Sequence, residues 1–168
     1  MLTGRLEGKI IVAEGDEVND IYSDRWIGNL EGGKLLLDPV EAAYLFERGR
    51  LEIVMDDEKI DFVEFLKFCN DIDKNFMSRY AVYCDLMSRG LTVRPGYVET
   101  DFKVYERSAK QDKKVKWIVF VSADDSECEI SRLDKVTKLA QNIRALALWA
   151  VVDADLDVTY YIINSISP

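Results

Sequence analysis

The second half of the chain alternates between β-rich and helix-forming segments, and this order restricts the possible folds more than any other feature. Residues 102–105, 115–122, 148–152 and 158–163 are rich in β-branched and aromatic side chains. Such compositions are typical of strands that pack on a hydrophobic core. Residues 134–147 separate two of these segments and are predicted to form a helix. We therefore expect an α/β domain in the C-terminal part of the chain.

The first half contains shorter elements, which predict a small α+β domain. Asp38 followed by Pro39 is a helix start in which Asp38 caps the first turn, and Gly49 ends that helix. Residues 4–12 form either one strand or two short strands that turn at Gly8. The other predicted elements are a helix over 14–22, a loop over 28–33, strands over 34–37, 51–54 and 91–93, and helices over 61–72 and 75–89. We place the N-terminal domain at residues 1–72 and the C-terminal domain at residues 73–168.

The chain is acidic, with a formal net charge of −9 in 168 residues, and it contains no histidine. A protein that binds nucleic acid on its own is usually basic, because its affinity comes largely from neutralising phosphates. Contact with RNA would therefore need a local basic patch or a basic partner chain. Alternatively, the excess of acidic residues serves solubility alone.

Other features predict a cytoplasmic protein that does not enter a membrane. The longest apolar run, residues 145–152, is much shorter than the roughly 20 residues that span a bilayer. The N-terminal residues lack the charged and apolar regions of a signal peptide. The three cysteines Cys69, Cys84 and Cys128 form no CxxC pair and are predicted to be reduced thiols.

Five stretches of the sequence resemble the archaeal tRNA-splicing endonuclease family, in the order in which that family has them. They are residues 32–49, 80–90, 93–96, 101–107 and 149–161. The resemblance implies a restriction-endonuclease-like α/β C-terminal domain with a mixed sheet, preceded by a small α+β domain. It also implies cleavage of precursor tRNA at bulge–helix–bulge sites without a metal or any other cofactor.

The chemistry of this family needs three side chains, and the sequence keeps one of them. In the family, a tyrosine takes the proton from a ribose 2′-hydroxyl, a histidine protonates the departing 5′-oxygen, and a lysine stabilises charge on the phosphate. The products are a 2′,3′-cyclic phosphate and a 5′-hydroxyl. By this resemblance Tyr105 falls on the tyrosine position, whereas Lys114 replaces the histidine and Ala145 replaces the lysine.

These two replacements predict a subunit without a complete active site. A lysine side chain has a pKa of about 10.4, so Lys114 is a poor proton donor near neutrality. Loss of a general acid costs roughly 10²–10⁴ in rate. Loss of a preorganised charge, as at Ala145, costs roughly a further 10²–10³. The alternative is a self-sufficient, metal-free ribonuclease that uses Tyr105 with Lys114 or Arg144.

The resemblance also implies partners. Family enzymes are assemblies of four subunits or subunit-equivalents with two active sites. We expect this chain to join a catalytic subunit in a heterotetramer that contains two of each and cuts precursor tRNA. The loop with Asp153, Asp155 and Asp157 is expected to dock in a basic pocket of another subunit. The final strand, with Tyr160 and Tyr161, is expected to pair with a partner chain. The alternatives are a solvated turn or a Ca²⁺ loop without EF-hand spacing, and an edge strand covered by the chain's own helices.

Direct contact with RNA is implied at few positions. Family enzymes hold a bulged base between arginine side chains. Lys138 stands at one such position, where it is a poorer stacking group, and Arg144 follows it later in the same predicted helix. A basic run either touches phosphate or belongs to a solvated loop, and its members are Lys110, Lys113, Lys114 and Lys116.

Three further alternatives remain open. Outside the family context, Tyr105 is an ordinary strand tyrosine that packs on the core. A metal-dependent nuclease would use Asp101, but it needs a cluster of carboxylates and a lysine on adjacent strands, and no convincing second carboxylate stands out. The third alternative is a protein-interaction module unrelated to RNA.

Overall fold

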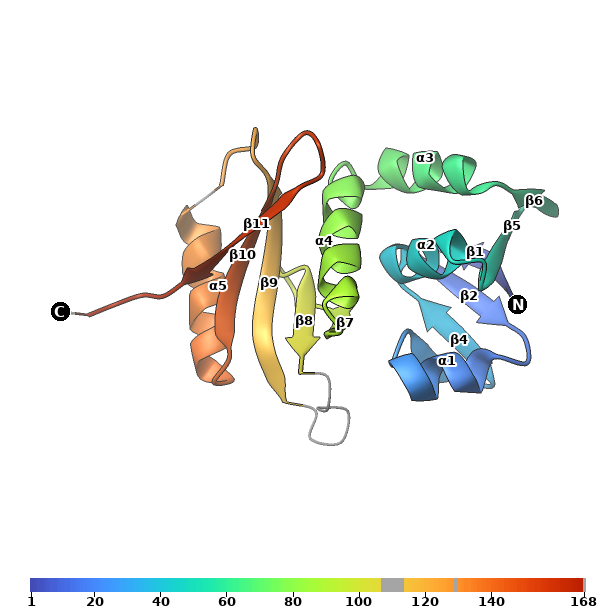
Figure 1. Ribbon diagram of the computed structural model, residues 1–168, viewed down its shortest axis with the longest axis horizontal. Helices are drawn as coiled ribbons and strands as arrows, with labels where there is room; N and C mark the ends of the chain where they lie inside the picture. Colours follow the sequence, from blue (N-terminus) through green and yellow to red (C-terminus); the bar gives the residue numbers. More distant parts are fainter. Residues whose placement is uncertain (107–113, 129, 168) are drawn as a thin grey trace. The chain divides into compact units, whose positions relative to one another are not determined.

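The computed structural model describes residues 1–106, 114–128 and 130–167, which form two compact units, Met1–Tyr80 and Ala81–Pro168 (Figure 1). The boundary between the units falls within helix α4 (Phe76–Ser88), later than the predicted division after residue 72. The predicted fold class is confirmed, because each unit contains a mixed sheet with helices. Within these described ranges, no helix is both long enough and apolar enough to cross a membrane.

A six-stranded sheet forms the centre of the N-terminal unit, in the order β3-β4-β2-β1-β5-β6. Its strands are β1 (Leu2–Glu7), β2 (Ile10–Glu14), β3 (Asn29–Glu31), β4 (Lys34–Leu37), β5 (Leu51–Met55) and β6 (Glu58–Ile60). β1 and β5 are parallel, and the other neighbours are antiparallel. Of the two alternatives for the first segment, the pair of short strands that turn at Gly8 is therefore correct.

The helices of this unit are α1 (Val18–Arg25), α2 (Pro39–Glu47) and α3 (Phe62–Ile72). α2 and α3 both begin with a capping box, formed by Asp38 with Glu41 and by Asp61 with Glu64. In α3, the Asp61 carboxylate accepts the Glu64 N–H and the Glu64 carboxylate accepts the Asp61 N–H, both at 2.8 Å. These reciprocal bonds satisfy backbone donors at the helix start. Because the caps are local, both helix starts could be predicted from the sequence.

Two local predictions in this unit were wrong. Of the residues predicted as a helix over 14–22, Glu14 is the last residue of β2, residues 15–17 form a turn, and the helix begins only at Val18. Residues 28–33 were predicted as a loop, but they contain β3, which pairs with β4. The turn between these strands uses Gly32 and Gly33 at φ values of 58° and 78°. Glycine adopts such angles without steric cost, so the hairpin can form.

A five-stranded sheet forms the centre of the C-terminal unit, in the order β11-β10-β9-β8-β7. Its strands are β7 (Thr92–Pro95), β8 (Phe102–Tyr105), β9 (Val115–Ala123), β10 (Leu146–Val152) and β11 (Val158–Ile163). β9 and β10 are parallel and are joined by helix α5 (Ile130–Asn142), whereas the other neighbours are antiparallel. The sheet is therefore mixed, as predicted.

Helices cover both faces of this sheet. Tyr83 of α4 packs on Phe102 of β8, with ring centroids 5.8 Å apart. On the other face, the Arg132 guanidinium of α5 lies 5.3 Å from the ring centroid of Phe120 on β9. Side chains alternate between faces along a strand, and Phe102 pairs with Val119, so Phe102 and Phe120 lie on opposite faces of the sheet. Figure 1 shows the sheet between α4 and α5.

The prediction for α5 was wrong at both ends. The helix was expected over residues 134–147, but it begins at Ile130 and ends at Asn142. Residues 146–147 instead begin β10, where buried Ala147 pairs with Ile118 of β9. Alanine and leucine favour helices in isolation, but the preference is small and burial in the sheet outweighs it.

Candidate active site

Strand register brings the three predicted positions to the same end of the C-terminal sheet. Tyr105 is the last residue of β8 and pairs with the first residue of β9. Lys114 directly precedes β9, so it lies at the end of the sheet where Tyr105 lies. Ala145 directly precedes β10, whose first residue pairs with Trp117 near the start of β9. Residues distant in sequence therefore gather at this end, which we call the tyrosine end.

Tyr105 is 6% exposed, and a basic pair lies beside it. Burial raises the pKa of Tyr105, Tyr97 adds to the increase, and the Arg94 charge partly opposes it. Arg94 of β7 is itself only 7% exposed and lies directly opposite Lys103 of β8. Burial, with repulsion from Arg94, lowers the pKa of Lys103, whose ammonium lies 4.8 Å from the Tyr97 ring centroid.

Sequence reasoning missed Arg94 and Lys103 as neighbours of Tyr105. Each lies in a short strand between apolar residues, within stretches that carry the family resemblance. Alternation alone would have placed Lys103 on the same face of β8 as Tyr105. The pairing that places Arg94 opposite Lys103 could be learned only from the structure.

Lys114 and Ala145 do not have the surroundings of catalytic groups. Lys114 is exposed. Ala145 follows the turn after α5, and its N–H donates to the Ala140 carbonyl at 2.8 Å. Arg144 is exposed and has a left-handed backbone, with φ of 58°. A guanidinium and an ammonium are therefore both at the tyrosine end, but neither group is held in a buried environment.

The other predicted RNA contacts are also on the surface. The Lys138 ammonium forms an ion pair with Asp134 one turn earlier on α5, at 2.8 Å. In the basic run, the Lys116 ammonium lies 3.2 Å from the Glu106 carboxylate and 4.4 Å from the Trp117 ring centroid. Two members of the run, Lys110 and Lys113, lie outside the described residues.

The acidic loop is an ordered turn at the opposite end of β10 from Ala145. The Asp153 carboxylate accepts the N–H groups of Asp155 and Asp157 at 2.9 and 3.0 Å. The Asp153 N–H donates to the Asp157 carbonyl at 3.0 Å and closes the turn. Asp153 therefore builds the loop, while Asp155 and Asp157 present exposed carboxylates. Among the described residues, no group of three or more cysteine, aspartate or glutamate side chains is arranged to hold a metal ion.

The two tyrosines of β11 face different surroundings. The Tyr160 hydroxyl donates to the Asp85 carboxylate of α4 at 2.6 Å, and Arg89 donates to the same oxygen at 3.0 Å. Tyr161 packs against Trp149, with ring centroids 5.7 Å apart, but stays 50% exposed, and Ile162 is 58% exposed. Because β11 is the edge strand of the sheet, one side of its backbone is open to pairing.

Comparison with known proteins identifies relatives along nearly the whole chain. Residues 2–66 match the family model of the tRNA intron endonuclease N-terminal domain, and residues 76–160 match that of the tRNA intron endonuclease catalytic C-terminal domain. The chain is 33% identical to a tRNA-splicing endonuclease of Thermococcus gammatolerans over 154 residues, which cover 91% of this chain and 90% of that protein. It is 33% identical to one of Pyrococcus abyssi over 145 residues, covering 86% and 84%. A tRNA-splicing endonuclease of Methanosarcina mazei is 32% identical over 169 aligned positions, which cover all of this chain but 47% of that longer protein.

Proposed function

The chain belongs to the tRNA intron endonuclease family, and we propose that it acts there as a structural subunit without a complete active site. The proposal is supported chiefly by the tyrosine end. By resemblance, the positions of the proton donor and of the charge-stabilising lysine are Lys114 and Ala145, and the sequence has no histidine to replace the donor. The complex as a whole would remove introns from precursor tRNA at bulge–helix–bulge sites.

The environment of Tyr105 supports the same proposal. A tyrosine that takes a proton works better when its own pKa is low, because the phenolate is then more abundant at neutral pH. Burial acts in the opposite direction at Tyr105 and raises its pKa. Lys114 is exposed, and the sequence has no histidine to act as the proton donor. In this proposal the tyrosine end therefore offers neither a favoured base nor a positioned acid.

In this proposal a catalytic subunit completes the enzyme, as a heterotetramer with two subunits of each kind. The chain carries a net charge of −9, so most of the charge that attracts RNA would come from a basic partner. Exposed carboxylates of Asp155 and Asp157 suit a basic pocket on that partner. The half-exposed side chains of Tyr161 and Ile162, on an edge strand, suit a second contact through β11.

Cleavage assays on the separate and mixed subunits test this proposal. The substrate is an end-labelled RNA with a bulge–helix–bulge junction, incubated with this chain, with a catalytic subunit, or with both. We expect no cleavage by this chain alone and cleavage by the mixture, which should have the mass of four subunits. Cleavage at the junction by this chain alone would refute the proposal.

A second candidate function is a self-sufficient ribonuclease, favoured by one observation. Arg144 and Lys114 are exposed cations at the end of the sheet where Tyr105 lies. If one of them acted with Tyr105, the chain alone would cleave RNA, and a lysine acid would move the optimum to alkaline pH. A pH–rate profile of the isolated chain distinguishes this function from the structural one.

A further inference from the structure

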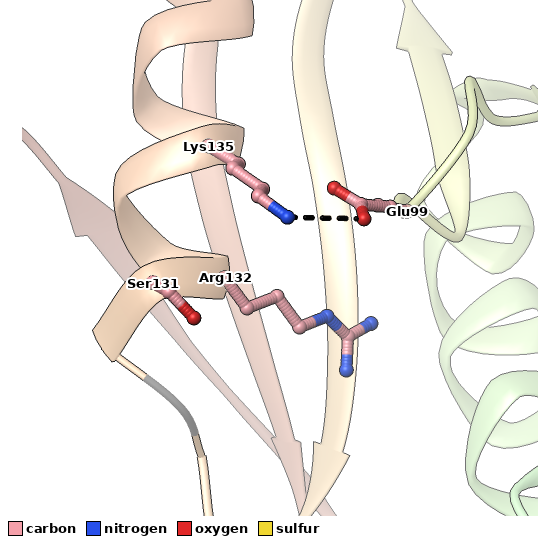
Figure 2. A pocket seen from close by; sticks show the side chains of 4 residues that line it. All are labelled: Glu99, Ser131, Arg132 and Lys135. Atoms are coloured by element: carbon pink, nitrogen blue, oxygen red, sulfur yellow. Dashed lines mark hydrogen bonds and ion pairs between the residues drawn. The ribbon is translucent and has the colours of Figure 1, made fainter.

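A groove runs between the first turns of α5 and the segment that connects β7 to β8. One of its two pockets has a volume of about 200 Å³ and is lined by Glu99, Ser131, Arg132 and Lys135. An adjoining pocket of about 180 Å³ shares Glu99 and Lys135 and extends toward Leu139. Figure 2 shows Arg132 and Lys135 reaching from α5 toward the connecting segment. We call this feature the α5 groove.

Arg132 lines the α5 groove and is held in place by two contacts. Its guanidinium donates to the Asp101 carboxylate at 3.3 Å and lies 5.3 Å from the Phe120 ring centroid. Asp101 is itself anchored, because the same carboxylate oxygen accepts the Val121 N–H at 2.6 Å. Even so, 38% of the Arg132 side chain remains exposed. A guanidinium has five donors in a planar arrangement that matches a phosphate, so an oriented and accessible arginine is suited to binding one.

Lys135 supplies a second cation, which forms a weak ion pair with Glu99. Its ammonium lies 3.2 Å from the Glu99 carboxylate, and both side chains are at least half exposed, at 60% and 51%. Exposed ion pairs of this kind contribute little to stability. Another anion can therefore replace the Glu99 carboxylate beside Lys135 at little cost in free energy.

We propose that Arg132 and Lys135 bind a backbone phosphate of RNA in the α5 groove and that this phosphate displaces Glu99 from Lys135. This inference rests on the proposed function, since it takes RNA as the ligand of the complex. Arg132 and Lys135 are three residues apart on α5, which corresponds to about 4.5 Å of helix rise, and both line the same pocket. Lys138, one step further along, points about 120° away from Arg132 around the helix axis and pairs with Asp134. Two neighbouring cations can hold one phosphate together, and they provide a local basic patch on an acidic chain.

Binding of a labelled RNA to the full-length chain tests the proposal. The probe is a fluorescein-labelled RNA with a bulge–helix–bulge junction, and fluorescence anisotropy is measured at several salt concentrations. We expect Lys135→Gln to weaken binding about fivefold and to reduce the slope of log affinity against log salt by about 1. Arg132→Gln should have a similar effect. The matched control is Lys59→Gln in the N-terminal unit, which removes the same charge from an exposed lysine that is also ion-paired. It should change the affinity by less than about twofold.

Glu99→Gln provides a second test, in which the affinity for RNA should rise and not fall. It removes the carboxylate that competes for Lys135, so the affinity for RNA should rise about threefold. Glu58→Gln is the control, because it makes the same charge change at another exposed glutamate and should raise the affinity clearly less. If each variant changed the affinity as much as its control did, the proposal would be overturned, because the changes would then depend only on the total charge of the chain. Displacement of the RNA by inorganic phosphate at a concentration similar to that of the RNA would assign the groove to free phosphate and overturn it too.

The results also separate this inference from the proposed function. If the chain alone cleaves the RNA while the variants behave as expected, the structural-subunit proposal fails and the α5 groove stands. If the variants match their controls while the mixture of subunits still cleaves, the groove assignment fails and the subunit proposal stands. If the wild-type chain binds the RNA at no salt concentration, the groove assignment fails.

Discussion

Replacing Tyr160 by phenylalanine removes the hydroxyl that ties the last strand to α4. This hydroxyl donates to the Asp85 carboxylate at 2.6 Å, beside the bond from Arg89 at 3.0 Å. A hydrogen bond to a charged group contributes about 1.5–3 kcal/mol. Water can replace part of the loss, because 32% of the Asp85 side chain is exposed. We therefore expect Tyr160→Phe to lower the free energy of unfolding of the C-terminal unit by about 1–1.5 kcal/mol.

Urea unfolding followed by tryptophan fluorescence measures this change. Trp149 lies on β10 and stacks on Phe120, with centroids 5.7 Å apart, so its emission reports the sheet that carries β11. Tyr161→Phe is the matched control, because this neighbouring hydroxyl has no hydrogen-bond partner among the described residues and its loss should change stability by less than about 0.5 kcal/mol. Equal unfolding free energies for the two variants would refute the reasoning.

The pH dependence of the unfolding free energy gives an independent check on the hydrogen bond between Tyr160 and Asp85. Burial, together with the bond to Asp85, raises the pKa of Tyr160. The fold thus favours the neutral hydroxyl, whose contribution is complete below the unfolded-state pKa of about 10 and is lost as the pH rises above that value. The stability advantage of the wild type over Tyr160→Phe should therefore be constant from pH 7 to 9 and shrink above pH 10. An advantage that grows above pH 10 would contradict the assigned direction.

Three other perturbations have defined outcomes. Asp153→Ala removes the acceptor of two backbone N–H groups in the acidic loop, so the amides of Asp155 and Asp157 should exchange with solvent faster, by NMR, than in a Lys59→Gln control. Asp38→Ala removes the cap of α2 and should lower the free energy of unfolding of the N-terminal unit by about 1 kcal/mol, measured by urea unfolding. Burial raises the pKa of Cys69 to about 12, so this thiol should react with a maleimide at pH 8 much more slowly than the two half-buried cysteines, as mass spectrometry of peptides would show.

Local patterns predicted those elements whose cause is local. The starts of α2 and α3 depend on Asp38 and Asp61, whose capping partners lie three residues away. β8 and β11 were predicted with their observed bounds, because short apolar runs between polar segments allow few other positions. The C-terminal end of α5 depends instead on the pairing of residues 146 and 147 with β9, and no local pattern contains that information.

In the candidate site, too, the sequence predicted some features and not others. The resemblance placed Tyr105, Lys114 and Ala145, and the strand register brings these positions to one end of the sheet. Neither composition nor motif indicated that Arg94 would lie buried opposite Lys103. The α5 groove also depends on tertiary structure, since Asp101 orients Arg132 across thirty-one positions of sequence. Long-range contacts of this kind set the electrostatics of the site, and a single sequence does not reveal them.

The central claim is that the tyrosine end of this chain takes no part in the chemistry of the complex. The most direct test is the single-turnover rate of RNA cleavage by the mixed enzyme, with Tyr105→Phe in this chain. We predict a rate within about twofold of the unmodified mixture, because the reacting groups belong to the partner. A fall of roughly 10² or more, the size expected when a catalytic base is lost, would contradict the claim.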